Sequence, residues 1–168
     1  MVEYKVIDNF LSEDIFLKTI SKISDLNFSW KYNNMVTGNE IKENMNGYFT
    51  YLVYTNQMKF VGNFINDSLM RIFRPILNKM DIKRLIRIKL NLYTRTDYLV
   101  HHDDHIDFPH SHKGAVFSLN TCDGFTVIDG DEISSVANRM VFFDPSILHH
   151  STNCTNKPYR MNINFNYV

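Results

Sequence analysis

The stretch YRMNINFNY, residues 159–167, alternates polar and apolar side chains without interruption. Successive residues of a β-strand point to opposite faces, so the alternation separates two sets of side chains. One face carries Met161, Ile163, Phe165 and Tyr167, and the other carries Arg160, Asn162, Asn164 and Asn166. We predict a strand with a core on one side and a wet pocket or solvent on the other, because a buried unpaired guanidinium is costly.

Similar strand signals fill the second half of the chain. RLIRIKLNLY (84–93) alternates with the same period. Three further apolar runs are GAVFSLN (114–120), FTVIDG (125–130) and RMVFFD (139–144). Many short strands separated by Gly, Asp, Pro and Asn are typical of a sandwich or jelly roll.

The first half predicts two helices. In LSEDIFLKTISKISDL (11–26), Ser12 is a candidate N-cap, and apolar residues then recur at helical spacing. MKFVGNFINDSLMRIFRPILNKM (58–80) also predicts a helix, which Pro75 should kink or break.

EYKVIDNF (3–10) and YFTYLVYT (48–55) predict strands in the first half, and the polar segment 31–47 predicts a surface loop. We therefore expect an α+β fold in a single domain over residues 1–168. A helix-rich part (1–83) would support a jelly-roll core (84–168).

Bulk composition excludes some partners. The chain has 18 basic and 18 acidic residues, so its formal net charge of zero favours neither nucleic acid nor an anionic membrane. Only Cys122 and Cys154 are thiols, which predicts a reduced, cytoplasmic setting. No signal peptide or membrane span is expected, and the oligomeric state stays open.

The seven histidines form two clusters. Five lie in HHDDHIDFPHSH (101–112), and the others are His149 and His150. The first cluster holds three His-x-Asp triplets: His101–Asp103, His102–Asp104 and His105–Asp107. A strand aims residues i and i+2 at one point, so each triplet offers an imidazole beside a carboxylate.

Two histidines and one carboxylate form the facial triad of non-haem Fe(II) oxygenases. In a continuous strand, 101, 103, 105 and 107 would share a face, and 102 and 104 would face away. We favour His105–Asp107 because it precedes Phe108-Pro109, where the strand should end, and keep the other triplets as alternatives. The second cluster would supply the third ligand. A solvated His/Asp loop is the competing interpretation.

Arg160 is suited to bidentate capture of a carboxylate. Asn91 and Tyr93 share a face of the strand that leads toward the first histidine cluster, and an amide and a phenol both suit an anionic ligand. An exposed polar strand face and an ordinary core tyrosine are the competing interpretations.

The order Asn91-x-Tyr93, His105-x-Asp107, His149 and Arg160-x-Asn162 resembles the Fe(II)/2-oxoglutarate-dependent dioxygenases, and their prolyl 4-hydroxylase-like branch in particular. The resemblance covers roughly residues 85–168, and YKVIDNFLSED (4–14) is similar to that branch's opening. In relatives the distal histidine stands five residues before a Cys-Thr pair, here Cys154-Thr155, which favours His149 over His150.

The resemblance implies a double-stranded β-helix with Fe(II) on His105, Asp107 and His149. It also implies 2-oxoglutarate on Arg160 and Tyr93, with Asn91 or Asn162 assisting. The reaction would hydroxylate an unactivated C–H bond of a peptidyl proline, an amino acid or a small molecule and release succinate and CO2, with ascorbate as a candidate reductant.

This sequence departs from the family pattern at two positions. Asn162 replaces a frequent serine, which puts that contact with 2-oxoglutarate in doubt. Asn166 stands where the nucleic-acid demethylase branch has a second arginine, so a nucleic-acid substrate is not expected. We expect His110 and His112 on the substrate side, near a lid that segment 31–47 would help to form.

Two other function classes compete. A cupin-like metal-binding jelly roll, acting as an isomerase or binding module, would need the metal but not Arg160. A β-sandwich interaction module would need neither. The basic run RIFRPILNKMDIKRLIRIKL (71–90) is interpreted as the wet face of a helix and strand.

Overall fold

The computed structural model describes residues 3–24, 29–34, 47–56, 64–65 and 67–168. The helices are α1 (Glu13–Ile23) and α2 (Asp67–Leu77). The strands are β1 (Lys5–Ile7), β2 (Lys31–Asn33), β3 (Tyr48–Thr55), β4 (Phe64–Ile65), β5 (Leu85–Thr94), β6 (Lys113–Ser118), β7 (Phe125–Ile128), β8 (Asp131–Ser134), β9 (Met140–Phe143), β10 (His149–Ser151) and β11 (Tyr159–Tyr167).

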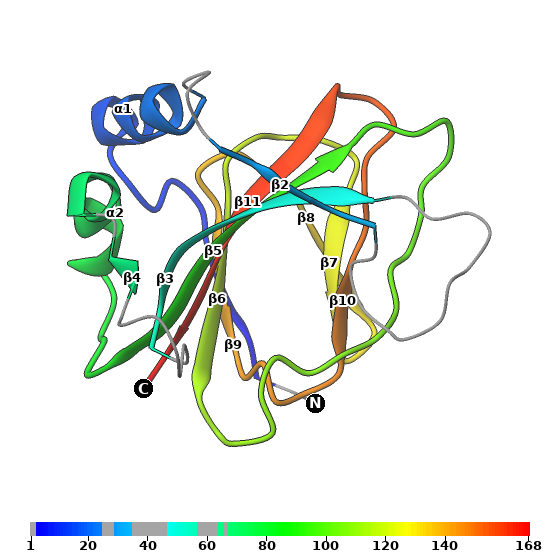
Figure 1. Ribbon diagram of the computed structural model, residues 1–168. Helices are drawn as coiled ribbons and strands as arrows, with labels where there is room; N and C mark the ends of the chain where they lie inside the picture. The colour runs from blue at the N-terminus through cyan, green and yellow to red at the C-terminus, as the bar shows by residue number, and fades with distance from the viewer. Residues whose placement is uncertain (1–2, 25–28, 35–46, 57–63, 66) are drawn as a thin grey trace.

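The strands form two antiparallel sheets. The larger sheet has the order β1-β9-β6-β11-β5-β3-β2, with β4 added to β3, and the smaller sheet has the order β10-β7-β8. Figure 1 shows the smaller sheet opposite one face of the larger sheet, with α1 and α2 beyond the other face. This two-sheet, helix-supported arrangement confirms the predicted α+β jelly roll.

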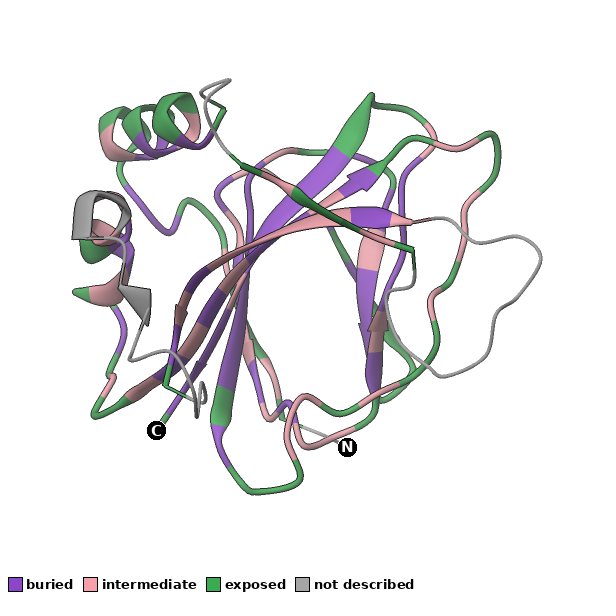
Figure 2. Cartoon of the chain, in the orientation of Figure 1, coloured by how far each residue is buried: buried purple, intermediate pink, exposed green. Residues whose placement is uncertain are grey.

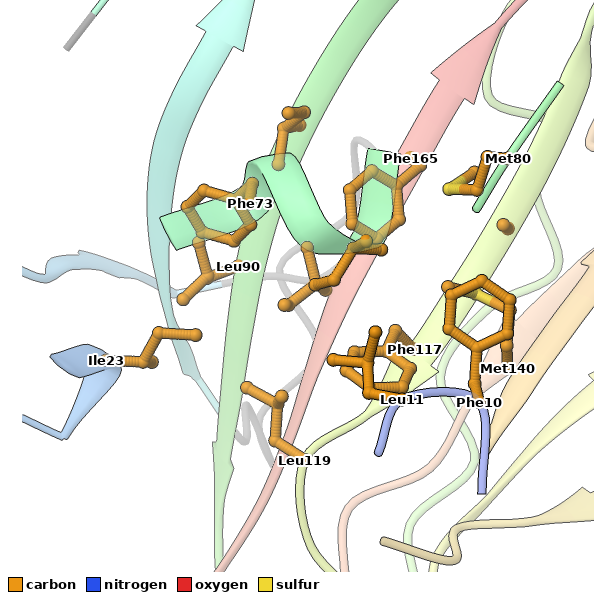
Figure 3. Close-up of a cluster of buried hydrophobic side chains, with 14 of the residues drawn as sticks. Phe10, Leu11, Ile23, Phe73, Met80, Leu90, Phe117, Leu119, Met140 and Phe165 are labelled. Carbon is orange, nitrogen blue, oxygen red and sulfur yellow. The ribbon is translucent and has the colours of Figure 1, made fainter. Parts of the chain in front are cut away.

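The main hydrophobic core lies between the larger sheet and the helices. Phe165 of β11 packs there with Leu90 of β5 and Phe73 of α2 (Figure 3). Ile163 of β11 belongs to the same cluster. The central strands are largely buried, whereas the outer faces of the helices are exposed (Figure 2). The apolar face of β11 therefore holds the helices, as its alternation predicts.

A smaller cluster on the other face of the larger sheet joins the two sheets. Val116 of β6 and Val141 of β9 pack there with Ile128 of β7 and Ile133 of β8. The apolar side chains of this cluster fill one end of the space between the sheets, and the polar face of β11 lines the rest of it.

The second predicted helix is shorter than expected. It begins at Asp67, and Phe64–Ile65 pair with β3 as β4; residues 57–63 and 66 lie outside the described part. Pro75 does not break α2, which continues to Leu77. Proline removes one backbone hydrogen bond here, in the last turn of the helix, where few further bonds depend on it.

Strands from the first half contribute to the larger sheet. β1 pairs with β9, and β3 pairs with β5. Within the predicted loop 31–47, residues 31–33 form β2, while the 35–46 portion of the predicted lid lies outside the described residues. No helix in the described part of the chain is long and apolar enough to cross a membrane.

Candidate metal centre

His105, Asp107 and His149 lie together between the sheets. Each can offer one ligand atom such that all three atoms lie within 4.8 Å of one another. His149 begins β10 and is 5% exposed, and His105 and Asp107 belong to the long connection between β5 and β6. The structure therefore brings together the three residues proposed as metal ligands.

The two histidines are held side by side by backbone pairing. His105 N–H donates to the carbonyl of His149, and His149 N–H donates to the carbonyl of His105, each at 3.0 Å. Their ring centroids are 4.4 Å apart. A two-residue bridge thus joins segments that are distant in sequence and sets the spacing of the imidazoles.

Hydrogen bonds at Nδ1 orient both rings. His149 Nδ1 lies 2.8 Å from the carbonyl oxygen of Ile147, and His105 Nδ1 lies 3.3 Å from that of Asp103. A carbonyl can only accept, so Nδ1 carries the proton and Nε2 keeps its lone pair. This is the usual way that a metal-binding histidine is prepared.

Asp107 is held by two side chains from the larger sheet. Arg87 Nη2 donates to Oδ1 at 2.7 Å, and Asn166 Nδ2 donates to Oδ2 at 2.7 Å. Arg87 Nε also donates to Asn166 Oδ1 at 2.9 Å. The carboxylate is therefore fixed in position while each oxygen retains a lone pair for a metal.

The site favours the protonation states that a metal requires. Burial acts to raise the pKa of Asp107, but the Arg87 charge and the hydrogen bonds from Asn166 and Arg87 outweigh it and hold the pKa at about 2. Burial, followed by the neighbouring His149, lowers the pKa of His105 to about 4, and burial also lowers the pKa of His149. At neutral pH the three residues are one carboxylate and two neutral imidazoles.

Arg160 occupies the other end of the space between the sheets. It is 1% exposed, and its Nη1 and Nη2 donate to Thr152 O at 2.7 Å and Thr126 Oγ1 at 2.8 Å. Its Nε has no partner, and it is paired with no carboxylate of a described residue. A Cβ at Gly124 would lie 2.7 Å from Arg160 Cδ, so glycine makes room for this side chain.

Tyr93, Asn91 and Asn162 lie next to Arg160 on the same face of the larger sheet. The Arg160 guanidinium is 5.6 Å from the centre of the Tyr93 ring, and the Tyr93 hydroxyl accepts a hydrogen bond from Ser151 Oγ at 3.1 Å. Asn91 Nδ2 donates to Asn162 Oδ1 at 2.8 Å, and Asn91 Oδ1 is buried without a partner. A buried cation and an unsatisfied amide thus stand together, as in a site that awaits a polar ligand.

The first histidine cluster lies in a loop and not in a continuous strand. Residues 101–112 do not form the continuous strand on which the facing argument rested; His101 and His105 make only isolated bridges, to Thr152 and His149. That premise is wrong because the loop pairs with the β10 edge at two points and bends between them. Its selection of His105–Asp107 nevertheless coincides with the residues that meet His149.

His150 and His102 point to different surroundings. His150 Nδ1 lies 2.6 Å from Asp104 Oδ1, and its Nε2 lies 3.1 Å from His101 Nδ1, on the outer side of β10. His102 stacks on Tyr93 with ring centroids 5.1 Å apart, and its Nδ1 lies 2.8 Å from Ser151 Oγ. Burial, together with the Arg160 charge, lowers the pKa of His102 to about 4.

His110 and His112, expected on the substrate side, differ in burial. His110 is exposed and stacks on Phe108. His112 is 6% exposed, and its Nε2 lies 3.2 Å from Asn166 Nδ2, the same amide nitrogen that holds Asp107. His112 therefore contacts the support of the metal site.

The sequence did not predict that Arg87 and Asn166 hold Asp107. Arg87 and Lys89 were interpreted as part of a solvated basic face, but both are on the β5 face that carries Asn91 and Tyr93, and both are partly buried. The period-two alternation from Arg87 to Tyr93 was the available signal, since it places all four polar residues on one face.

No protein-family profile and no curated protein sequence matches this chain. Solved structures do. A prolyl-4-hydroxylase from Pseudomonas putida aligns over 99% of this chain and 93% of its own, with a TM-score of 0.60 and 14% identity. The α-ketoglutarate-dependent epimerase SnoN of nogalamycin biosynthesis has a TM-score of 0.66 and 12% identity over 99% and 78% of the two chains.

HygX from Streptomyces hygroscopicus, solved with nickel and 2-oxoglutarate bound, has a TM-score of 0.63 and 9% identity over 99% of this chain and 82% of its own. At these identities the comparisons establish a shared fold. The structural neighbours thus include a prolyl-4-hydroxylase and 2-oxoglutarate-dependent enzymes, in agreement with the fold that the sequence resemblance implies.

Proposed function

We propose that this protein is a non-haem Fe(II)- and 2-oxoglutarate-dependent dioxygenase. The observation that carries the proposal is the triad of His105, Asp107 and His149, whose ligand atoms lie within 4.8 Å of one another, with His149 buried and the other two residues half-buried. Two imidazoles and one carboxylate are the ligands of non-haem Fe(II) oxygenases, which leave other metal positions open for substrates.

The chain's own residues prepare this set for a metal. Backbone carbonyls keep Nε2 of both histidines free, and Arg87 and Asn166 keep Asp107 ionised and fixed. Such supporting contacts commonly change metal affinity by 10- to 100-fold when they are removed.

The fit to 2-oxoglutarate rests on Arg160. A fully buried guanidinium with an unpartnered Nε and no carboxylate partner among the described residues is costly, and a bound dicarboxylate would supply the missing charge. We assign Arg160 to the distal carboxylate of 2-oxoglutarate, with Tyr93, Asn91 and Asn162 beside it. A half-turn of an amide side chain exchanges its oxygen and its nitrogen. If the amides of Asn91 and Asn162 both turn, the hydrogen bond between them is kept with donor and acceptor exchanged, and an N–H of Asn91 takes the place of the oxygen that lacks a partner.

When bound, Fe(II) and 2-oxoglutarate would supply the oxidation of an unactivated C–H bond by dioxygen: one oxygen atom would enter the substrate as a hydroxyl group, and the other would enter succinate as 2-oxoglutarate loses CO2. The protein holds both groups, orients the substrate and excludes water. We propose hydroxylation of a peptide, an amino acid or a small molecule, with ascorbate able to maintain the ferrous state.

Succinate formation tests this proposal against a cupin-like isomerase or binding module. Purified protein with Fe(II), ascorbate and 2-oxoglutarate should release succinate, and a panel of peptides, amino acids and other carboxylic acids should include compounds that raise the rate. Arg160→Met should release far less succinate than wild type at a 2-oxoglutarate concentration near the wild-type midpoint. Bound metal with no succinate under any condition would favour the alternative, which does not require Arg160.

A further inference from the structure

A second cationic region adjoins the triad, and Arg160 is not among the residues that line it. A cavity of about 630 Å³ is lined by Lys31, Arg87 and Lys89, together with aromatic and polar side chains of β3 and the loop after Asp107. No acidic residue is among the described residues that line it. Arg87 is paired with Asp107, so the net positive charge of the cavity comes from Lys31 and Lys89.

Arg87 has an ion-pair partner, whereas Lys89 has none among the described residues. Arg87 pairs with Asp107 and Asn166, and its guanidinium stacks over the Phe108 ring at 5.0 Å. Within the described part of the chain, Lys89 Nζ has no hydrogen-bond acceptor and no ion-pair partner, and it lies 5.9 Å from the centroid of the Tyr48 ring. Lys89 is the cation that remains available to a ligand.

The surroundings of Lys89 make this lack of a partner costly. Burial, with the neighbouring Arg87 charge, outweighs the opposing effect of the Asp107 carboxylate and lowers the pKa of Lys89 to about 8, so the ammonium form still predominates at neutral pH. A partly buried ammonium is stabilised by an anion that replaces its lost hydration. The middle of a sheet facing the site is an unusual place for such a group unless a ligand completes it.

The cavity also adjoins the metal centre. Arg87 lines the cavity and bonds to Asp107, and Phe108, the residue after Asp107, lines it too. A molecule bound at Lys89 would therefore lie beside the triad.

We propose that Lys89 anchors the anionic group of the primary substrate, whose apolar part lies against Tyr48, Leu52 and Phe108. The substrate class is an organic acid, most simply a carboxylate with an aromatic or aliphatic body of modest size. This inference rests on the proposed oxygenase function, because it assigns the anion site to the substrate of that enzyme. Its physical content, an anion site at Lys89 separate from Arg160, can be measured without turnover.

Calorimetric binding of matched probes to the full-length protein tests the proposal. The probes are phenylacetate, its neutral counterpart phenylacetamide, and phenyl phosphate, which distinguishes a carboxylate from a phosphate group. We expect phenylacetate to bind at least about tenfold more tightly than phenylacetamide, as expected for one charge-assisted hydrogen bond. Tighter binding of phenyl phosphate than of phenylacetate would overturn the carboxylate assignment.

Two Lys89 variants locate the site. Lys89→Met should remove the preference for the acid over the amide, and Lys89→Arg should retain part of it. The visible absorption band of the anaerobic Fe(II)–2-oxoglutarate complex should have the same 2-oxoglutarate midpoint in wild type and Lys89→Met. Loss of 2-oxoglutarate binding in Lys89→Met would instead make Lys89 the partner of 2-oxoglutarate and overturn the proposal.

The same titration on chelator-treated protein separates the two claims. The acid preference should persist without metal, because none of the residues that line the cavity belongs to the triad. A preserved preference with no Fe(II)–2-oxoglutarate band would refute the oxygenase and leave the anion site intact. Equal binding of acid and amide, or no binding of either, to folded wild type overturns the Lys89 site whatever the band shows.

Discussion

On β11, Ile163 and Phe165 pack under the helices, whereas Arg160 and Asn166, on the opposite face, belong to the proposed 2-oxoglutarate site and the proposed metal site. The apolar residues are almost fully buried and interchangeable in kind with the rest of the core. The polar residues are equally buried, yet each makes directed hydrogen bonds, and Arg160 keeps one donor without a partner. In a central strand, one face can therefore stabilise the core while the other face carries the residues of a functional site.

The most severe test of this division is at the triad. His149→Ala should abolish Fe(II) binding, because the remaining ligands form only part of the set. His150→Ala is the matched control, since its side chain faces Asp104 and His101. Metal content after anaerobic reconstitution checks both variants; iron retained by His149→Ala but lost by His150→Ala would move the site to the outer side of β10.

Arg160→Met should separate 2-oxoglutarate binding from metal binding. We expect the affinity for 2-oxoglutarate to fall about 100-fold, as for the loss of two charge-assisted hydrogen bonds. Fe(II) binding and folding should be preserved, because the change removes a costly buried charge. Titration of 2-oxoglutarate into the metal-loaded variant measures the effect, and wild-type affinity would contradict the assignment of Arg160.

Ile163→Ala examines the other face of the same strand. Ile163 is fully buried, so truncation should reduce the free energy of unfolding by about 2–5 kcal/mol while the folded fraction keeps its Fe(II) affinity. Urea denaturation and metal titration give the two numbers. A large fall in the metal affinity of folded protein would show that the two faces are not independent.

Asn166→Ala should weaken Fe(II) binding by about 10- to 100-fold, because Asp107 loses a hydrogen bond that orients it. Asn164→Ala is the control: Asn164 shares this face, but no hydrogen bond joins it to the triad. Equal effects in both variants would mean that Asn166 acts only through general packing.

The smallest expected effect is on pH dependence. The pKa values of His102 and His105 are about 4 in the folded chain, below the ordinary 6.5, so between these values the unfolded chain binds more protons. Stability of the metal-free protein is therefore full above about pH 6.5 and falls as the pH drops toward 4. Urea midpoints at pH 7.5 and 5 check this; His102→Gln should reduce the difference, and a midpoint that rises at low pH contradicts it.

The strands that the sequence predicts best are those with a long alternation of polar and apolar residues. β5 and β11 carry their period-two pattern over nine or more residues, and the structure has them within one residue of the predicted bounds. β10 has three residues and no such pattern, and its position depends on pairing with β7 and with the loop at His105.

The residues of the candidate site also differ in whether the sequence alone can identify them. His105, Asp107, His149 and Arg160 were identifiable because their residue types are few and their order resembles a known family. Arg87 and Asn166 were not, since their role depends on two strands placing an arginine and an amide on either side of one carboxylate. Charge-rich runs also resemble solvated surface until the neighbouring strands are known, as at Lys89.

The most direct test of the central claim is an anaerobic titration of wild-type protein with Fe(II) and 2-oxoglutarate, followed by visible absorption. If the triad and Arg160 bind the pair together, a metal-to-ligand charge-transfer band appears only when both are present, and it is absent in His149→Ala. Folded wild-type protein that gives no band at saturating Fe(II) and 2-oxoglutarate would contradict the assignment.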